Sequence, residues 1–179
     1  PKLLQLYGQT AMGLLVADAV CCVDYLSGRP EIDPERIGVA GFSLGGIAAF
    51  YAQVVDPRLA GAAIFCGGVG SLAHLVRAGQ DQFHSVYFYP PGLLAAGLDH
   101  PSLVPALAPR PLLVAAACQD EGMPLSGVEA FAVAARAAYP EQGERFRLLV
   151  EPGPHAMTLT AFEGAAGWMQ AQWGNAAQG

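Results

Sequence analysis

The sequence predicts an α/β fold, in which a mostly parallel sheet is covered by helices. Helical patterns alternate with short apolar runs along the chain, as expected for successive strand and helix units. The apolar runs show no polar alternation, which is typical of strands buried on both faces of a parallel sheet. No internal repeat or low-complexity linker interrupts the sequence, so we expect a single domain over residues 1–179.

The predicted elements follow one another in a regular order. A helix with one apolar face, from Met12 to Leu26, is stopped by Gly28 and Pro30. The elements expected after it are a strand over 36–40, a helix over 45–52, strands over 59–66 and 111–117, a helix over 126–139, a strand over 146–150 and a helix over 157–173. Residues 67–109 break the alternation and hold Gly, Pro, His and an aromatic cluster. Because so long a segment between strands is usually functional, we expect a cap or binding loop there.

The composition narrows the classes of partner. Apolar residues make up 53% of the chain and charged residues 13%, as in a packed globular protein. The formal charge is −6 and the basic residues are scattered, which disfavours nucleic acid and anionic membrane surfaces. No run approaches the roughly 18 consecutive apolar residues of a membrane span. We therefore expect neither nucleic acid nor a membrane as a partner.

Four cysteines are present, and their spacing indicates no metal site. Cys21, Cys22, Cys66 and Cys118 form no C-x-x-C pair and have no histidine at metal-ligand spacing. Free cysteine behaves as a small apolar residue, so we expect buried free thiols. This usage leaves the cellular compartment open.

The segment Gly41-Phe42-Ser43-Leu44-Gly45-Gly46 carries a G-x-S-x-G pattern. A turn this tight between a strand and a helix has no room for side chains two residues before and after the serine. A β-branched strand is predicted to run into the pattern and an Ala-rich helix out of it, which disfavours a glycine-rich turn with an incidental serine. The pattern therefore predicts that Ser43 is an exposed nucleophile.

A serine nucleophile needs a general base, and the base needs an acid that fixes its tautomer. Asp120 directly follows the third predicted strand, and His155 follows the fourth. In open α/β sheets, ligands bind beyond the carboxyl ends of the strands. Ser43, Asp120 and His155 are therefore expected to meet at one edge of the sheet.

Each partner of Ser43 has competitors in the sequence. Glu121, Asp99 and Glu151 are alternative acids, Glu121 being adjacent to Asp120. The alternative bases all lie in the segment 67–109 and none directly follows a strand: His74, His84 and His100.

Several segments resemble α/β-hydrolases of the dienelactone hydrolase and acetyl xylan esterase type. They are Asp24-Tyr25-Leu26, residues 33–39 leading into the serine turn, Pro91-Gly92-Leu93-Leu94, residues 108–113, Asp120 with Pro124, and Gly153-Pro154-His155. The resemblance implies an α/β-hydrolase fold, with the acid at Asp120 and the base at His155.

The resemblance also implies parts that have no counterpart in the sequence. Family members carry several strands before the helix at 11–27, and an early loop that donates one oxyanion N–H. The backbone N–H of Leu44 is expected to supply another such donor. We therefore expect the chain to be the C-terminal portion of a hydrolase domain whose N-terminal strands are missing. The unpaired sheet edge would then favour a homo-oligomer.

The predicted function is that of a serine esterase, which cleaves a small-molecule carboxylic ester through an acyl-enzyme on Ser43. This chemistry needs no metal and no organic cofactor. Phe42, Tyr87 and Tyr89 are candidate substrate-binding residues, although the aromatic cluster at 83–89 is equally suited to form a small core of its own. The alternatives are a prolyl-oligopeptidase-type peptidase, a non-catalytic binding module and a truncated inactive fragment. The sequence does not specify the ester.

Overall fold

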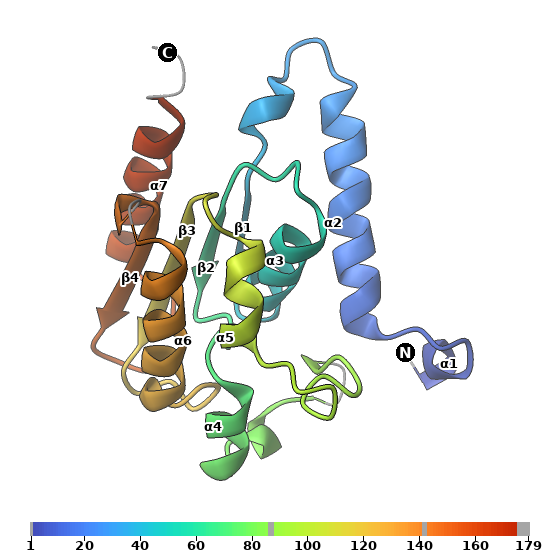
Figure 1. The fold of residues 1–179 in the computed structure, drawn as a ribbon, viewed down its shortest axis with the longest axis vertical. Helices are drawn as coiled ribbons and strands as arrows, with labels where there is room; N and C mark the ends of the chain where they lie inside the picture. Colours follow the sequence, from blue (N-terminus) through green and yellow to red (C-terminus); the bar gives the residue numbers. More distant parts are fainter. Residues whose placement is uncertain (1, 86–87, 141–142, 175–179) are drawn as a thin grey trace.

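A computed structural model describes residues 2–85, 88–140 and 143–174, and a parallel sheet forms its centre (Figure 1). Within these residues the sheet has the order β1-β2-β3-β4, and all neighbouring strands are parallel. The strands are β1 (Val39–Phe42), β2 (Ala62–Phe65), β3 (Leu112–Ala117) and β4 (Phe146–Glu151). Because they are parallel, their carboxyl ends lie at the same edge.

The helices confirm the α/β class. They are α1 (Lys2–Leu6), α2 (Ala11–Ser27), α3 (Leu44–Val55), α4 (Leu72–Arg77), α5 (His100–Leu103), α6 (Leu125–Ala138) and α7 (Leu159–Gly174). Figure 1 shows α7 on one face of the sheet, with α3, α5 and α6 on the other. In the part of the chain that the structure describes, no helix is long and apolar enough to cross a membrane.

The strand predicted over 36–40 was placed too early. Pro34–Arg36 form a short 3₁₀ turn, which begins where the Asp33 carboxylate accepts a hydrogen bond from the Glu35 N–H at 3.0 Å. Proline favours such a turn start because its φ is already fixed near the value required. The strand therefore begins only at Val39 and runs directly into Ser43.

Apolar side chains cover both faces of the central strands. On one face, Phe50 of α3 and Phe131 of α6 pack in one cluster with Ile64 of β2. On the other face, Ala165 of α7 packs with Leu113 of β3. Strands β2 and β3 are buried throughout, as predicted, whereas β1 and β4 are partly exposed because each pairs on one side only among the described residues.

The burial predicted for α2 was only partly correct. Met12 and Val23 are buried, but Leu15 is 38% exposed on the face expected to be covered. The cysteine prediction was also partly wrong. The thiols are free and Cys66 is buried, but Cys21, Cys22 and Cys118 are exposed. Cys21 and Cys22 are exposed because this helix packs mainly along one side of α3.

Asp99 holds the segment 67–109 together. Its carboxylate accepts hydrogen bonds from the N–H groups of Leu72 and His100, each at 2.7 Å, and from the Ser71 hydroxyl at 2.7 Å. Burial alone would raise the pKa of Asp99, but these hydrogen bonds outweigh it and hold the pKa below its usual value. One carboxylate thus accepts hydrogen bonds from free backbone N–H groups at the starts of both α4 and α5.

His100 is a buried core residue. Its Nδ1–H donates to the Gly70 carbonyl at 2.9 Å, and its Nε2 accepts from the Tyr51 hydroxyl at 2.8 Å. Burial lowers the pKa of His100 to about 4, although the nearby Asp99 opposes the shift. The imidazole is therefore neutral in the folded protein at neutral pH.

We predict that His100 makes the protein less stable in acid. As the pH falls from the ordinary histidine pKa of 6.5 towards 4, the unfolded chain gains a proton that folded His100 does not. The free energy of unfolding should fall by up to about 3 kcal/mol over this window through His100 alone.

Urea unfolding of wild type and His100→Gln between pH 7 and pH 4 measures this contribution. At pH 7 the variant should be less stable by about 1–3 kcal/mol, because a buried hydrogen-bond partner is lost. The difference in the free energy of unfolding between wild type and His100→Gln should narrow as the pH falls. In the control His74→Gln, the free energy of unfolding should change with pH as it does in wild type. If the free energy of unfolding of wild type and of His100→Gln changed with pH in parallel, the lowered pKa of His100 would be contradicted.

Candidate active site

Ser43 occupies a strained turn between β1 and α3. Its backbone has φ 55° and ψ −123°, in the left-handed half of conformational space that L-residues rarely adopt. The Ser43 N–H donates to the Phe65 carbonyl at 2.9 Å, which holds the turn against β2. A Cβ at position 41 would overlap the Gly45 carbonyl, and one at position 46 would lie 2.8 Å from Cα of Gly67. Close backbone approach therefore requires glycine at position 41, as the pattern predicted, and at position 46. The prediction was wrong for Gly45, where an added Cβ would meet nothing within 4 Å.

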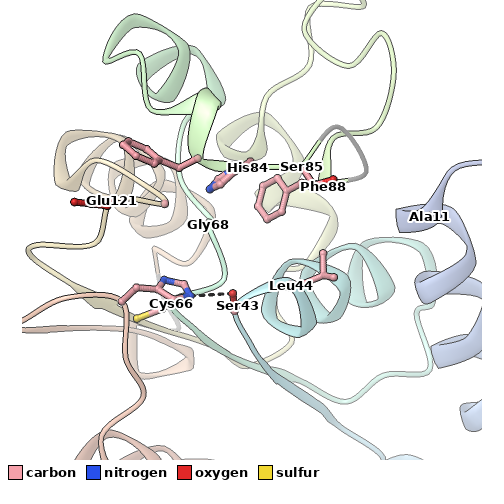
Figure 2. A pocket seen from close by; sticks show the side chains of 12 residues that line it. Ala11, Ser43, Leu44, Cys66, Gly68, His84, Ser85, Phe88 and Glu121 are labelled. Carbon is pink, nitrogen blue, oxygen red and sulfur yellow. Dashed lines mark hydrogen bonds between the residues drawn. The ribbon is translucent and has the colours of Figure 1, made fainter. Parts of the chain in front are cut away.

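The structure brings Ser43, His155 and Asp120 together. His155 Nε2 lies 2.9 Å from Ser43 Oγ, the contact drawn as a dashed line in Figure 2. His155 Nδ1 lies 3.0 and 2.9 Å from the two carboxylate oxygens of Asp120. Because a carboxylate can only accept, Nδ1 carries the proton, and Nε2 accepts from the Ser43 hydroxyl. The predicted convergence at the carboxyl edge of the sheet is confirmed as geometry.

The two partner loops are fixed by backbone contacts. The Cys118 N–H donates to the Glu151 carbonyl at 2.9 Å, and the Gln119 N–H donates to the Gly153 carbonyl at 3.0 Å. Gly153 has φ 118°, which only glycine adopts readily, so the chain can turn sharply before His155. The Asp120 side chain is 5% exposed and that of His155 is 38% exposed. The acid is therefore buried, and the base reaches the open cavity.

The competing acids lie elsewhere. Glu121 is exposed on the cavity wall, and Asp99 caps α4 and α5. Glu151 accepts a hydrogen bond from the Thr158 hydroxyl at 2.7 Å. The structure therefore places Asp120 against His155 and assigns its competitors other contacts.

The competing histidines are also accounted for. His100 is buried among Phe50 and Tyr51, and His74 lies on α4. His84 lines the cavity across from Ser43, as Figure 2 shows. His155 is the described histidine that bonds Ser43.

A cavity of about 570 Å³ opens beside Ser43. Part of its wall comes from the segment 67–109 through Phe83, His84 and Phe88, and other parts come from Ala11, Leu44 and Glu121. In Figure 2, His84 and Phe88 face Ser43 and Cys66 across the open space. The segment 67–109 thus supplies part of the cavity wall.

The aromatic side chains divide between the cavity and a small core. The Phe88 ring packs over Gly68, where a Cβ would lie 2.6 Å from the ring. Tyr89, predicted to bind substrate, packs against the apolar cluster that contains Leu72 and Leu75. The sequence analysis did not predict that Phe83 and Phe88 line the cavity. Their place in the aromatic cluster at 83–89 was the one sequence feature that could have indicated it.

Phe42 and Tyr87 are the other two candidate substrate-binding residues. Phe42 lies beside the catalytic candidate His155, with ring centroids 5.0 Å apart, and is not part of the cavity wall described above. Tyr87 lies outside the described residues.

His84 links the cavity wall to the loop that carries Asp120. Its Nδ1 lies 2.8 Å from the Tyr89 hydroxyl, and its Nε2 lies close to Gly122, 3.2 Å from where a Cβ would stand. The Gly122 N–H in turn donates to Asp120 at 2.7 Å. Burial lowers the pKa of His84, so the ring is neutral at neutral pH. A series of contacts therefore runs from His84 past Gly122 to Asp120, His155 and Ser43.

Comparisons with known proteins agree with this architecture. The chain matches the Dienelactone hydrolase family over residues 2–141. It is 27% identical over 171 residues to "Putative hydrolase YtaP" of Bacillus subtilis (strain 168), covering 94% of this chain and 56% of that protein.

Solved structures with similar folds include two glucuronoyl esterases. The enzyme from Solibacter usitatus has a TM-score of 0.78 and 20% identity, covering 92% of this chain and 50% of that one. The enzyme from Caldicellulosiruptor kristjansonii has a TM-score of 0.74 and 22% identity, covering 93% and 51%. A puromycin-hydrolyzing peptidase of Mycobacterium tuberculosis has a TM-score of 0.72 and 17% identity, covering 92% and 26%.

This chain spans about half the length of the curated relative and of the two esterases. The structural likenesses establish an α/β-hydrolase fold, and the family match covers most of the sequence. The chain belongs to the dienelactone hydrolase family.

Proposed function

We propose that the protein is a serine hydrolase that cleaves carboxylic esters through an acyl-enzyme on Ser43. The observation that carries this proposal is the hydrogen-bonded series from Ser43 through His155 to Asp120. Family membership and the fold shared with esterases support hydrolysis.

In the proposed mechanism, protons move along these hydrogen bonds. As Ser43 Oγ attacks the ester carbonyl carbon, its proton passes to His155 Nε2, and Asp120 stabilises the resulting imidazolium. The proton then passes to the leaving alcohol oxygen as the carbonyl–oxygen bond breaks. Water, activated by the same imidazole, releases the acid and restores Ser43.

The start of α3 offers an oxyanion donor. Leu44 is the first residue of this helix, so its N–H has no acceptor within the helix. The helix dipole adds positive potential at the same place. Such a donor contributes about 10²–10³ in rate when it binds the developing oxyanion.

The cavity favours an uncharged ester. Phe83, Phe88 and Leu44 make its wall largely apolar, and Glu121 adds a negative charge. Among the described residues, no lysine or arginine lines it. A substrate carrying a carboxylate would therefore bind without a compensating charge, whereas a neutral ester would bury its apolar part.

Replacing Ser43 tests the proposal directly. Ser43→Ala in the full-length protein should lower hydrolysis of a neutral aryl ester to less than about a thousandth of wild type, with an unchanged circular dichroism spectrum. Ser126→Ala, at an exposed position of α6, is the control and should leave turnover unchanged. Residual activity above that level would require another nucleophile. A matched anilide measured in parallel shows whether the enzyme prefers amides.

Asp120 and Glu121 should differ sharply in importance. Asp120→Asn should lower kcat by about 10⁴, because an amide favours the wrong imidazole tautomer. Glu121→Gln should stay near wild type, since the exposed Glu121 side chain does not contact His155. Steady-state kinetics of both variants decide between the two acids. A larger loss in Glu121→Gln would show that the acid is misassigned.

His84 should act on catalysis through Asp120. His84→Ala should lower kcat by about 10- to 100-fold while KM changes little, because misplacing the acid loop misaligns His155. Tyr89→Phe should produce a smaller effect in the same direction, and His74→Ala is the control. If His84→Ala instead raises KM with kcat unchanged, His84 serves only as part of the cavity wall.

A further inference from the structure

Three potential metal ligands meet beside Ser43. Cys66 follows β2, Asp120 follows β3 and His155 follows β4, so the parallel sheet brings them to one edge. The Cys66 thiol, a carboxylate oxygen of Asp120 and a ring nitrogen of His155 all lie within 4.8 Å of one another. Figure 2 shows the Cys66 sulfur on the same side of the cavity as Ser43.

The hydrolytic mechanism does not use the Cys66 thiol, yet the backbone fixes it firmly. Cys66 has φ 41°, a conformation that L-residues rarely adopt. Its N–H donates to the Ala115 carbonyl at 2.7 Å, and its thiol donates to the Ala156 carbonyl at 3.2 Å. Burial and the neighbouring Asp120 raise the pKa of the thiol to about 11, so it carries its proton at neutral pH. The Cys66 thiol is thus fixed beside Asp120 and beside the loop that carries His155.

We propose that Cys66, Asp120 and His155 form a binding site for Zn²⁺, and that bound Zn²⁺ prevents catalysis by Ser43. The metal would bind the Cys66 thiolate, one oxygen of Asp120 and Nδ1 of His155, with water in the fourth position. The thiol releases its proton to solvent when the metal binds, and the imidazole proton moves from Nδ1 to Nε2. Sulfur, imidazole and carboxylate together select zinc over magnesium or calcium, which prefer oxygen ligands.

Charge and access both suit a divalent cation. One thiolate and one carboxylate neutralise the two positive charges, so the zinc-bound site carries no net charge. Zinc–sulfur and zinc–nitrogen distances of about 2.3 and 2.0 Å place tetrahedral ligand atoms about 3.3–3.5 Å apart. His155 Nδ1 and the Asp120 oxygen, now 2.9 Å apart, must therefore separate slightly, whereas the Cys66 sulfur, within 4.8 Å of both, can move towards them. His155 lies on an exposed loop, so that side chain can move, and the metal enters from the cavity.

Zinc binding would switch off Ser43 through the tautomer of His155. In the metal-free site Nε2 accepts the Ser43 proton, as the 2.9 Å contact indicates. With Nδ1 bound to zinc, Nε2 carries a proton and donates to Ser43 Oγ instead. Ser43 then has no general base. This inhibition rests on the proposed function, whereas zinc binding itself does not.

Cadmium provides a readout that is independent of activity, because a cadmium–thiolate bond absorbs in the near ultraviolet. The parent is the full-length protein with exposed Cys21, Cys22 and Cys118 replaced by serine, so that Cys66 is the remaining thiol of this chain segment. Titration of the metal-free parent with Cd²⁺ should give a thiolate band that saturates at one equivalent. The band should disappear in Cys66→Ala, and Cys66→Ser is a second variant if the alanine protein unfolds.

Ester hydrolysis with added Zn²⁺ then tests the inhibition. Each variant is compared with its own metal-free rate. The parent should lose activity and regain it with EDTA, whereas Cys66→Ala should need at least about tenfold more zinc, as for loss of a metal-supporting residue.

The outcomes separate the metal site from the proposed function. Absence of the thiolate band in the parent, or equal zinc sensitivity in Cys66→Ala, would overturn the proposed site. If the parent shows the thiolate band and hydrolyses esters, but Zn²⁺ does not inhibit it, the metal site would stand and the proposed inhibition would be overturned. A Cys66-dependent band in a parent without hydrolase activity would support the site and contradict the proposed function.

Discussion

A serine with φ 55° and ψ −123° fits between a strand and a helix only where neighbouring residues lack Cβ atoms. Gly41 lets the first turn of α3 fold back over the end of β1, and Gly46 lets that helix approach Gly67 after β2. Both close approaches follow from the single backbone turn at Ser43. That turn also aims the Oγ and the first free N–H groups of α3 into the same space. The positions of the Ser43 Oγ and of the proposed oxyanion donor therefore both result from one local constraint.

The parallel sheet completes the site by bringing distant residues together. Cys66, Asp120 and His155 each follow a different strand, and backbone hydrogen bonds between the last two loops keep them adjacent. The Asp120 carboxylate is buried, whereas the His155 ring is partly exposed and reaches the cavity. The insertion then closes one side, and His84 connects that wall to the acid loop.

The residues of the central site could be predicted because their signals are local. Glycines flank Ser43, and Asp120 and His155 each follow an apolar run. The start of β1 was predicted too early because the turn at Pro34 is followed by an apolar residue, Ile37, that is buried without being in the strand.

Features that depend on tertiary contacts could not be predicted in the same way. Phe88 and Tyr89 are adjacent aromatics, and only packing decides that one faces the cavity and the other a small core. The proximity of Cys66 to His155 depends on the path of the loop after β4, for which the spacing of cysteines and histidines gave no signal. The link from His84 to Gly122 likewise joins segments whose pairing has no sequence pattern.

The central claim is that the turn and the paired imidazole make Ser43 a nucleophile. Covalent labelling of the full-length protein with a fluorophosphonate, followed by peptide mass spectrometry, measures this most directly. We expect one phosphonyl adduct per chain, on Ser43, which forms far more slowly when His155 is replaced by glutamine. An adduct on another residue, or equal labelling rates with and without His155, would contradict it.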